Sequence, residues 1–209
     1  MNQFFREYSV RAGKMYNSNG EFNLSIDGSG IIPSINESNV DLMYPLLKGY
    51  KIQLDIGGGM CHLTKMLNEH GIEGYSFEGS AVLINRIVCD KNRVAIIDMS
   101  KKINDKRLNR YFDITTSFEV IEHIHRNYQL QFWKNLSYLS QYHLCSIHVM
   151  NEEYAEHCTI NKPEIWERIF KDLGIKYQKI TDFPIRYWEC SAYYFLTLPK
   201  RIKNVSNFR

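Results

Sequence analysis

From about residue 50 onward, the hydrophobic and polar positions of the chain follow two alternating patterns. Short apolar runs of strand length predict seven β-strands, and the stretches between several of them carry apolar residues at helical spacing. The predicted strands are 50–56, 74–78, 94–98, 112–118, 143–149, 175–180 and 192–198. Helices are predicted over Cys61–His70, from Ser80, over Lys101–Arg110, in the stretch that ends at Leu139, and over Pro163–Leu173.

Strands that alternate with helices indicate an α/β fold, in which a largely parallel sheet is covered by helices on both faces. No helix is predicted between the last two strands, so the final strand is expected to run antiparallel. We therefore predict a Rossmann-like, seven-stranded sheet built from residues 49–199.

The two ends of the chain follow neither pattern clearly. Residues 1–48 contain several glycines and little periodicity, which predicts a helix-and-loop extension over the active site. Residues 200–209 are polar and are expected to form a flexible tail.

Composition restricts the class of protein further. The 209 residues are 44% hydrophobic and 23% charged, which is typical of one globular domain. The net charge of +3 is too small to indicate a nucleic-acid partner by itself. Five dispersed cysteines argue against a disulfide framework and a Cys-rich zinc site, and they favour a reducing, cytoplasmic location. We expect no secretory signal and no membrane span, because the apolar runs are only of strand length.

Three consecutive glycines, Gly57, Gly58 and Gly59, follow the first predicted strand. Glycine lets the backbone approach a ligand closely, and the next helix offers unpaired N–H groups at its start. In sheets of this kind, ligands bind at the carboxyl ends of the strands. A dinucleotide-binding turn would need a further glycine at the position of His62, so the pattern disfavours NAD.

Acidic residues lie at or near the ends of the first three strands: Asp55, Glu78 and Asp98. Glu78 is placed to accept hydrogen bonds from ribose hydroxyls, and Asp98 to accept one from an adenine amino group. Each acid could instead cap the following helix. Three acids at successive strand ends, beside a glycine turn, favour the cofactor interpretation.

The segments LDIGGG (54–59), FEGS (77–80), IIDMS (96–100) and SFEVIEHI (117–124) resemble, in order and spacing, the class I S-adenosylmethionine-dependent methyltransferases. The resemblance covers about residues 50–198 and implies the strand order 3-2-1-4-5-7-6 with S-adenosyl-L-methionine as cofactor. The cofactor-binding residues that it implies are Asp55, Gly57 and Gly59 for the methionine end, Glu78 and Gly79 for the ribose, Asp98 and Met99 for the adenine, and Ser117 and Phe118 beneath the sulfonium.

Glu119, Glu122 and His123 form an E-x-x-E-H motif that would lie on one face of a helix. Two carboxylates and an imidazole could hold Mg²⁺ or another divalent cation. A fourth ligand could be His125, His148 or His157, and we favour His157. This set is similar to that of the ubiquinone-biosynthesis O-methyltransferases and of the small-RNA 3′-terminal 2′-O-methyltransferases. In a metal-free alternative, Glu119 and Glu122 cap helices and His123 or His157 is the general base. The expected catalytic residues are His123, His157 and Glu119.

The function favoured by these features is S-adenosylmethionine-dependent O-methylation of a small molecule, such as a sugar, nucleotide-sugar or glycan hydroxyl. One alternative is an RNA ribose 2′-O-methyltransferase, although no RNA-binding module is evident. In that case the basic stretch 101–110, which we interpret as a solvated helix face, would bind RNA. A second alternative is a non-catalytic, cofactor-binding partner of an active methyltransferase.

Overall fold

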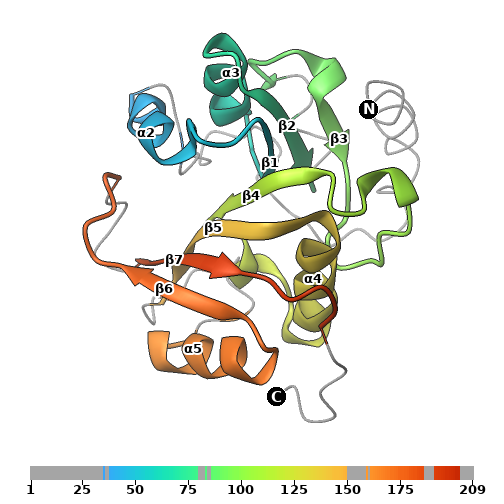
Figure 1. Cartoon of the computed structure of the whole chain (residues 1–209), viewed down its shortest axis with the longest axis vertical. Coiled ribbons are helices and arrows are strands. Elements are labelled where there is room, and N and C mark those ends of the chain that lie inside the picture. Colours follow the sequence, from blue (N-terminus) through green and yellow to red (C-terminus); the bar gives the residue numbers. More distant parts are fainter. Residues whose placement is uncertain are drawn as a thin grey trace. The chain divides into compact units, whose positions relative to one another are not determined.

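The computed structural model describes residues 35, 38–79, 83, 86–149, 159, 161–185 and 191–202. Within these residues, seven strands form one mixed sheet in the order β3-β2-β1-β4-β5-β7-β6, which confirms the predicted fold (Figure 1). The strands are β1 (Ile52–Ile56), β2 (Glu73–Glu78), β3 (Val94–Ile96), β4 (Phe112–Phe118), β5 (Ser140–His148), β6 (Lys176–Ile180) and β7 (Ser191–Thr197). The chain divides into two compact units, Met1–Asp98 and Met99–Arg209, which are described separately below.

In the first unit, β1 pairs in parallel with β2, and β2 pairs in parallel with β3. Helix α3 (His62–Glu69) buries Leu63, Met66 and Leu67 on one face, as the helical spacing predicts. The Asn68 side chain fixes the helix to β2, because it donates to the Gly74 carbonyl oxygen at 3.2 Å and accepts from the Gly74 N–H at 3.1 Å. Two short helices precede the sheet, η2 (Val40–Met43) and α2 (Tyr44–Leu47), and a third, η4 (Lys91–Arg93), precedes β3.

In the second unit, β4 pairs in parallel with β5, whereas β7 runs antiparallel to both β5 and β6. The predicted antiparallel final strand is therefore confirmed. Helices α4 (Arg126–Leu139) and α5 (Pro163–Asp172) pack through an edge-to-face aromatic contact, in which the ring centroids of Trp133 and Phe170 lie 5.4 Å apart. The Phe170 ring also lies edge-to-face with Tyr194 on β7, with ring centroids 5.3 Å apart. Within the described ranges, no helix is long and apolar enough to cross a membrane.

The predicted helix over Lys101–Arg110 is wrong. This segment contains only the single turn η5 (Lys106–Leu108), which Asp105 begins by accepting a hydrogen bond from the Arg107 N–H at 3.0 Å. The α4 residue Asn135 donates to the carbonyl oxygens of Met99 and Lys101 and accepts from the Ile103 N–H. In a helix over 101–110, the Lys101 carbonyl oxygen would accept from the Asp105 N–H, so its hydrogen bond to Asn135 competes with the helix, and packing overrides local helix propensity.

Other predicted boundaries change less. Strand β3 ends at Ile96, so Asp98 lies two residues beyond the strand that was expected to include it. The start of the helix predicted from Ser80 lies outside the described residues. Most of the 1–48 extension and most of the 200–209 tail also lie outside them. The domain boundaries therefore stay predictions.

Candidate functional site

The glycine turn after β1 favours glycine at each of its three positions. Gly57 and Gly59 have φ angles of +69° and +57°, which L-residues with a Cβ rarely adopt. At Gly58 the obstacle is space: an added Cβ would lie 2.9 Å from the Asp55 Oδ2 atom and closer still to the Ser76 Oγ atom. The turn is thus a close-packed feature, and its backbone N–H groups lie at the carboxyl end of β1.

Glu78, the last residue of β2, is directed at this turn. Its Oε2 atom accepts a hydrogen bond from the Gly59 N–H at 2.9 Å. Both Asp55 and Glu78 are buried, and a hydrogen bond between the Ile97 N–H and the Glu78 carbonyl oxygen continues the β2–β3 ladder. The structure therefore brings together two of the predicted cofactor-binding residues, Gly59 and Glu78.

Two further predicted residues of the first unit, Gly79 and Asp98, follow the ends of β2 and β3. Gly79 is exposed, and nothing lies within 4 Å of the position that a Cβ would take there. Asp98 is half-buried beyond β3, whose residue Ile96 is the register partner of Glu78.

In the second unit, Ser117 on β4 is held by a histidine that the sequence analysis did not identify. His143 on β5 lies between two hydroxyls: its Nδ1 atom is 2.8 Å from Thr115 Oγ1, and its Nε2 atom is 2.9 Å from Ser117 Oγ. Complete burial lowers the pKa of His143 to about 3, so the ring is neutral at physiological pH. The only sequence signal was alternation, which directs Thr115 and Ser117 to one face of β4 beside His143.

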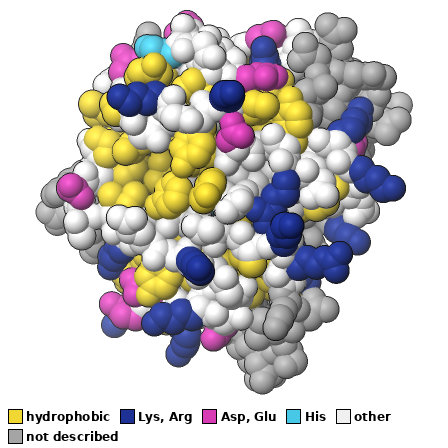
Figure 2. All heavy atoms as spheres, in the orientation of Figure 1, with side chains coloured by type: hydrophobic (Ala, Val, Ile, Leu, Met, Phe, Trp, Pro, Cys, Tyr) yellow, Lys and Arg dark blue, Asp and Glu magenta, His cyan; other side chains and the backbone are white. Residues whose placement is uncertain are grey.

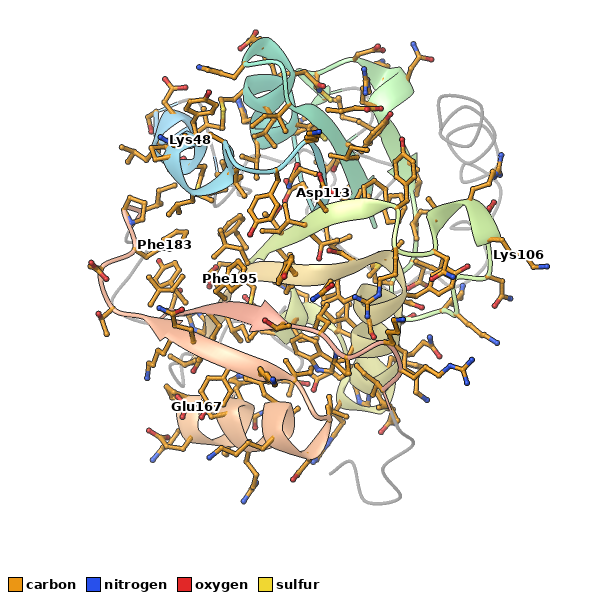
Figure 3. All side chains as sticks on the ribbon, viewed as in Figure 1. Lys48, Lys106, Asp113, Glu167, Phe183 and Phe195 are labelled. Carbon is orange, nitrogen blue, oxygen red and sulfur yellow. The ribbon has the colours of Figure 1, made fainter. Side chains whose placement is uncertain are left out.

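Two predicted cofactor residues of this unit, Met99 and Phe118, are buried. Phe118 begins an aromatic cluster: its ring centroid lies 6.0 Å from that of Phe183, which stacks on Tyr193 at 4.4 Å (Phe183 is labelled in Figure 3). Phe183 and Tyr193 come from the end of the chain, so the spacing of the motifs gave no indication of them.

Glu119 follows Phe118 in the left-handed conformation, with φ of +55°. Its N–H donates to Ser146 Oγ at 3.1 Å, and the Ser146 hydroxyl donates back to Glu119 Oε1 at 2.6 Å. The second carboxylate oxygen, Oε2, lies 3.5 Å from His148 Nδ1. Glu119 is therefore fixed to β5 through Ser146 and His148.

Glu122 lies in the single turn η6 (Ile121–His123) and is completely buried. Neither of its carboxylate oxygens has a hydrogen-bond partner of normal geometry within the described residues. Burial, followed by the nearby charge of Glu119, raises the pKa of Glu122 well above its ordinary value, although the backbone amides of Glu122 and His148 partly oppose this shift. A protonated Glu122 is the form that this environment favours.

The helical arrangement predicted for the E-x-x-E-H motif is wrong. Glu119 lies outside any helix, and the turn η6 begins after Val120. In the part of the chain that the structure describes, no three His, Cys, Asp or Glu side chains are arranged to hold a metal ion. The predicted ligand and base His157 lies outside this part, and His125 is exposed at the start of α4. The metal ligand set, and the catalytic roles of His123 and His157, stay predictions.

No family model matches the sequence, and no curated protein does. Solved structures are similar in fold. The methyltransferase domain of bacterial CtHen1 is 19% identical, with a TM-score of 0.57 over 78% of this chain and 100% of that domain. An S-adenosylmethionine-dependent methyltransferase from Clostridium acetobutylicum is 13% identical, with a TM-score of 0.59 over 78% of this chain and 92% of that protein. A Rhodobacter sphaeroides protein provisionally assigned as a Zn-dependent alcohol dehydrogenase is 11% identical, with a TM-score of 0.63 over 78% of this chain and 90% of that protein.

At these identities the similarity establishes the fold. The strand order and the antiparallel β7 are those of the Rossmann-like class I methyltransferase fold. What the chain binds has to be argued from its own residues.

Proposed function

We propose that this protein is an S-adenosylmethionine-dependent methyltransferase. The observation that carries the proposal is the hydrogen bond from the Gly59 N–H to Glu78 Oε2, which fixes a buried carboxylate against a close-packed glycine turn. A carboxylate there can accept hydrogen bonds from ribose hydroxyls, while the turn admits the methionine end of the same cofactor.

The same turn argues against a dinucleotide cofactor. Gly57 and Gly59 match the first two glycines of the dinucleotide-binding fingerprint G-x-G-x-x-G, but His62 stands where the third glycine would be. His62 is also the first residue of α3, at the point where a third glycine would allow close helix–strand packing.

The reaction that we propose is in-line transfer of the cofactor's methyl group to a hydroxyl oxygen of a small molecule, such as a sugar, a nucleotide-sugar or a glycan. The sulfonium already activates the methyl group, so the protein has to align the acceptor, exclude water and receive a proton. Ser117 and Phe118 would form the floor of the site. His123 or His157 would accept the proton, and Glu119 would assist.

A role for a divalent cation such as Mg²⁺ is left to experiment. Two carboxylates and an imidazole, those of Glu119, Glu122 and His148, lie in one region of the second unit. They do not form a site that could hold an ion as they are arranged, so we assign no step to a metal.

The charge of the chain also supports a compact acceptor. The face drawn in Figure 2 carries Asp and Glu side chains as well as Lys and Arg. Lys106, in the basic stretch, projects away from the fold (Figure 3). A bound RNA backbone requires several such cations, and a net charge of +3 leaves only a small excess of them.

RNA ribose 2′-O-methylation is the second candidate, because the E-x-x-E-H motif followed by His157 is similar to that of the small-RNA methyltransferases. Exposed Lys101, Lys102 and Lys106 could contact phosphates. This function predicts transfer that weakens steeply as salt rises.

Transfer of a labelled methyl group distinguishes these functions. The full chain is incubated with labelled cofactor and, separately, with sugars and nucleotide-sugars, phenols and short RNAs, with and without a chelator. We expect label on a sugar-class hydroxyl. Label on RNA alone would replace this acceptor class with the second candidate. A protein that binds the cofactor but labels nothing would be the non-catalytic partner. Full activity after chelation would remove the metal from the account.

A further inference from the structure

Two cysteines from different parts of the first unit meet beside the glycine turn. Cys61 is completely buried at the start of α3, with φ of +65°, and Cys89 is half-buried just before η4. The backbone holds the two segments together, because the Val88 N–H donates to the Met60 carbonyl oxygen at 3.0 Å. Cys61 and Cys89 directly follow these two bonded residues, so they lie close together, and each shifts the pKa of the other.

The two thiols differ in reactivity. The interaction with Cys61 lowers the pKa of Cys89, which is also the more accessible of the two. The same interaction, together with burial, raises the pKa of Cys61. Since the thiolate is the form that oxidants attack, Cys89 is the residue that would react first.

We propose that Cys61 and Cys89 form a reversible disulfide that lowers the affinity of the glycine turn for its cofactor. The disulfide is inferred from the proximity of the two cysteines, whereas its effect on the cofactor rests on the proposed function.

Hydrogen peroxide is a sufficient oxidant. The Cys89 thiolate attacks one peroxide oxygen, the O–O bond breaks, and a sulfenic acid and hydroxide form; the hydroxide takes up a proton. The Cys61 sulfur then attacks the Cys89 sulfur, an S–S bond replaces the S–O bond, and the hydroxyl group leaves with the Cys61 proton as water. Two thiols and one peroxide thus give one disulfide and two waters, and a dithiol reductant reverses the change.

Oxidation would alter the turn directly. The Cys61 Sγ atom lies 3.5 Å from the Gly59 carbonyl oxygen, to which its thiol can donate. A disulfide has no such proton, and its S–S bond of about 2.0 Å is much shorter than a contact between two thiols. Gly59 is the residue whose N–H holds Glu78, so a shift of Cys61 toward Cys89 would disturb that hydrogen bond too.

The first test is chemical. The full chain is treated with hydrogen peroxide and digested without reduction, and the peptides are analysed by mass spectrometry. We expect a Cys61–Cys89 linked peptide that disappears on reduction, is absent in Cys89→Ser, and still forms in the matched control Cys145→Ser. The chain has five cysteines, so a linkage of Cys89 to any other cysteine, or no linkage, would overturn the proposal.

The second test is calorimetric, with S-adenosylmethionine added to the reduced and to the oxidised protein. We expect binding about tenfold weaker after oxidation, the equivalent of one lost hydrogen bond, with full recovery on reduction. Oxidant should not change binding by Cys89→Ser. Equal affinity in both states would overturn the regulatory effect. Absence of binding even in the reduced protein would instead refute the proposed function, and the regulatory effect with it. The linked peptide tests whether the disulfide forms, whatever the binding result.

Discussion

His143 should make the stability of this protein depend on pH, because its ring is buried between Thr115 and Ser117 and is held neutral. The perturbation that we propose is acidification of the wild-type protein and of His143→Asn in parallel. As the pH of the wild-type protein falls, His143 is protonated in the unfolded state at a higher pH than in the folded state. Folding stability therefore decreases as the pH falls below the unfolded pKa.

The magnitude follows from two pKa values, 6.5 for an ordinary histidine and about 3 for His143 in the fold. Because the pKa of His143 is lower in the folded state than in the unfolded state, folding stability begins to fall as the pH drops to the unfolded pKa, and it continues to fall until the pH reaches the folded pKa. It amounts to about 1.4 kcal/mol per pH unit, or about 2 kcal/mol between about pH 7.5 and about pH 5. For a chain of this length, that corresponds to a decrease in Tm of about 4–8 °C.

Urea or thermal unfolding, followed by circular dichroism across this pH range, measures the effect. His143→Asn should be less stable at neutral pH, by about 1–3 kcal/mol, because it loses hydrogen bonds to buried hydroxyls. The difference from the wild type should then shrink by about 2 kcal/mol on acidification. The matched control is His125→Asn, which changes an exposed residue that begins α4. If the difference between His143→Asn and the wild type is the same at every pH, the assignment of His143 as a buried neutral residue is wrong.

The remaining predictions concern Glu122 and Gly58. Burial raises the pKa of Glu122 in the folded state, so protonated Glu122 stabilises the fold fully below the pKa of the unfolded state, and this stabilisation is lost as the pH rises. The Tm of Glu122→Gln, relative to that of the wild type, should therefore increase from pH 5 to pH 8. The exposed control Glu69→Gln should show no such increase. Gly58→Ala should destabilise the fold by about 1–3 kcal/mol in urea unfolding, because its Cβ would overlap the Ser76 hydroxyl, and Ser76→Ala should restore part of the loss. Gly49→Ala, where nothing lies within 4 Å, should be neutral or slightly stabilising, and equal effects at Gly49 and Gly58 would contradict the packing argument.

Much of the strand pattern was predictable because several strands give a strong local signal of apolar residues; β6, whose sequence is KYQKI, is an exception. Strand β4, for example, has the bounds that its sequence predicts, Phe112–Phe118. The region 101–110 was not predictable in the same way. Its Lys and Arg residues favour a helix locally, but a distant residue, Asn135, donates to the Lys101 carbonyl oxygen, which the helix would use.

The candidate site shows the same division. The glycine turn and Glu78 could be found from sequence, because glycine and acidic residues at strand ends have a local pattern, and the structure brings Gly59 and Glu78 together. The environment of Glu119 could not, since its left-handed backbone removes it from the helix that the spacing of E-x-x-E-H assumes. His143 has no motif at all, and only the pairing of β4 with β5 reveals it.

Binding of S-adenosylmethionine to the reduced full chain, measured by calorimetry, tests the central claim most directly. The wild type should bind, and Glu78→Ala should bind about 10- to 100-fold more weakly, the equivalent of charge-assisted hydrogen bonds worth about 1.5–3 kcal/mol. The matched control Glu69→Ala, on the exposed face of α3, should bind like the wild type. No binding by the wild type, or equal binding by wild type and Glu78→Ala, would contradict the assignment of this glycine turn as the cofactor site.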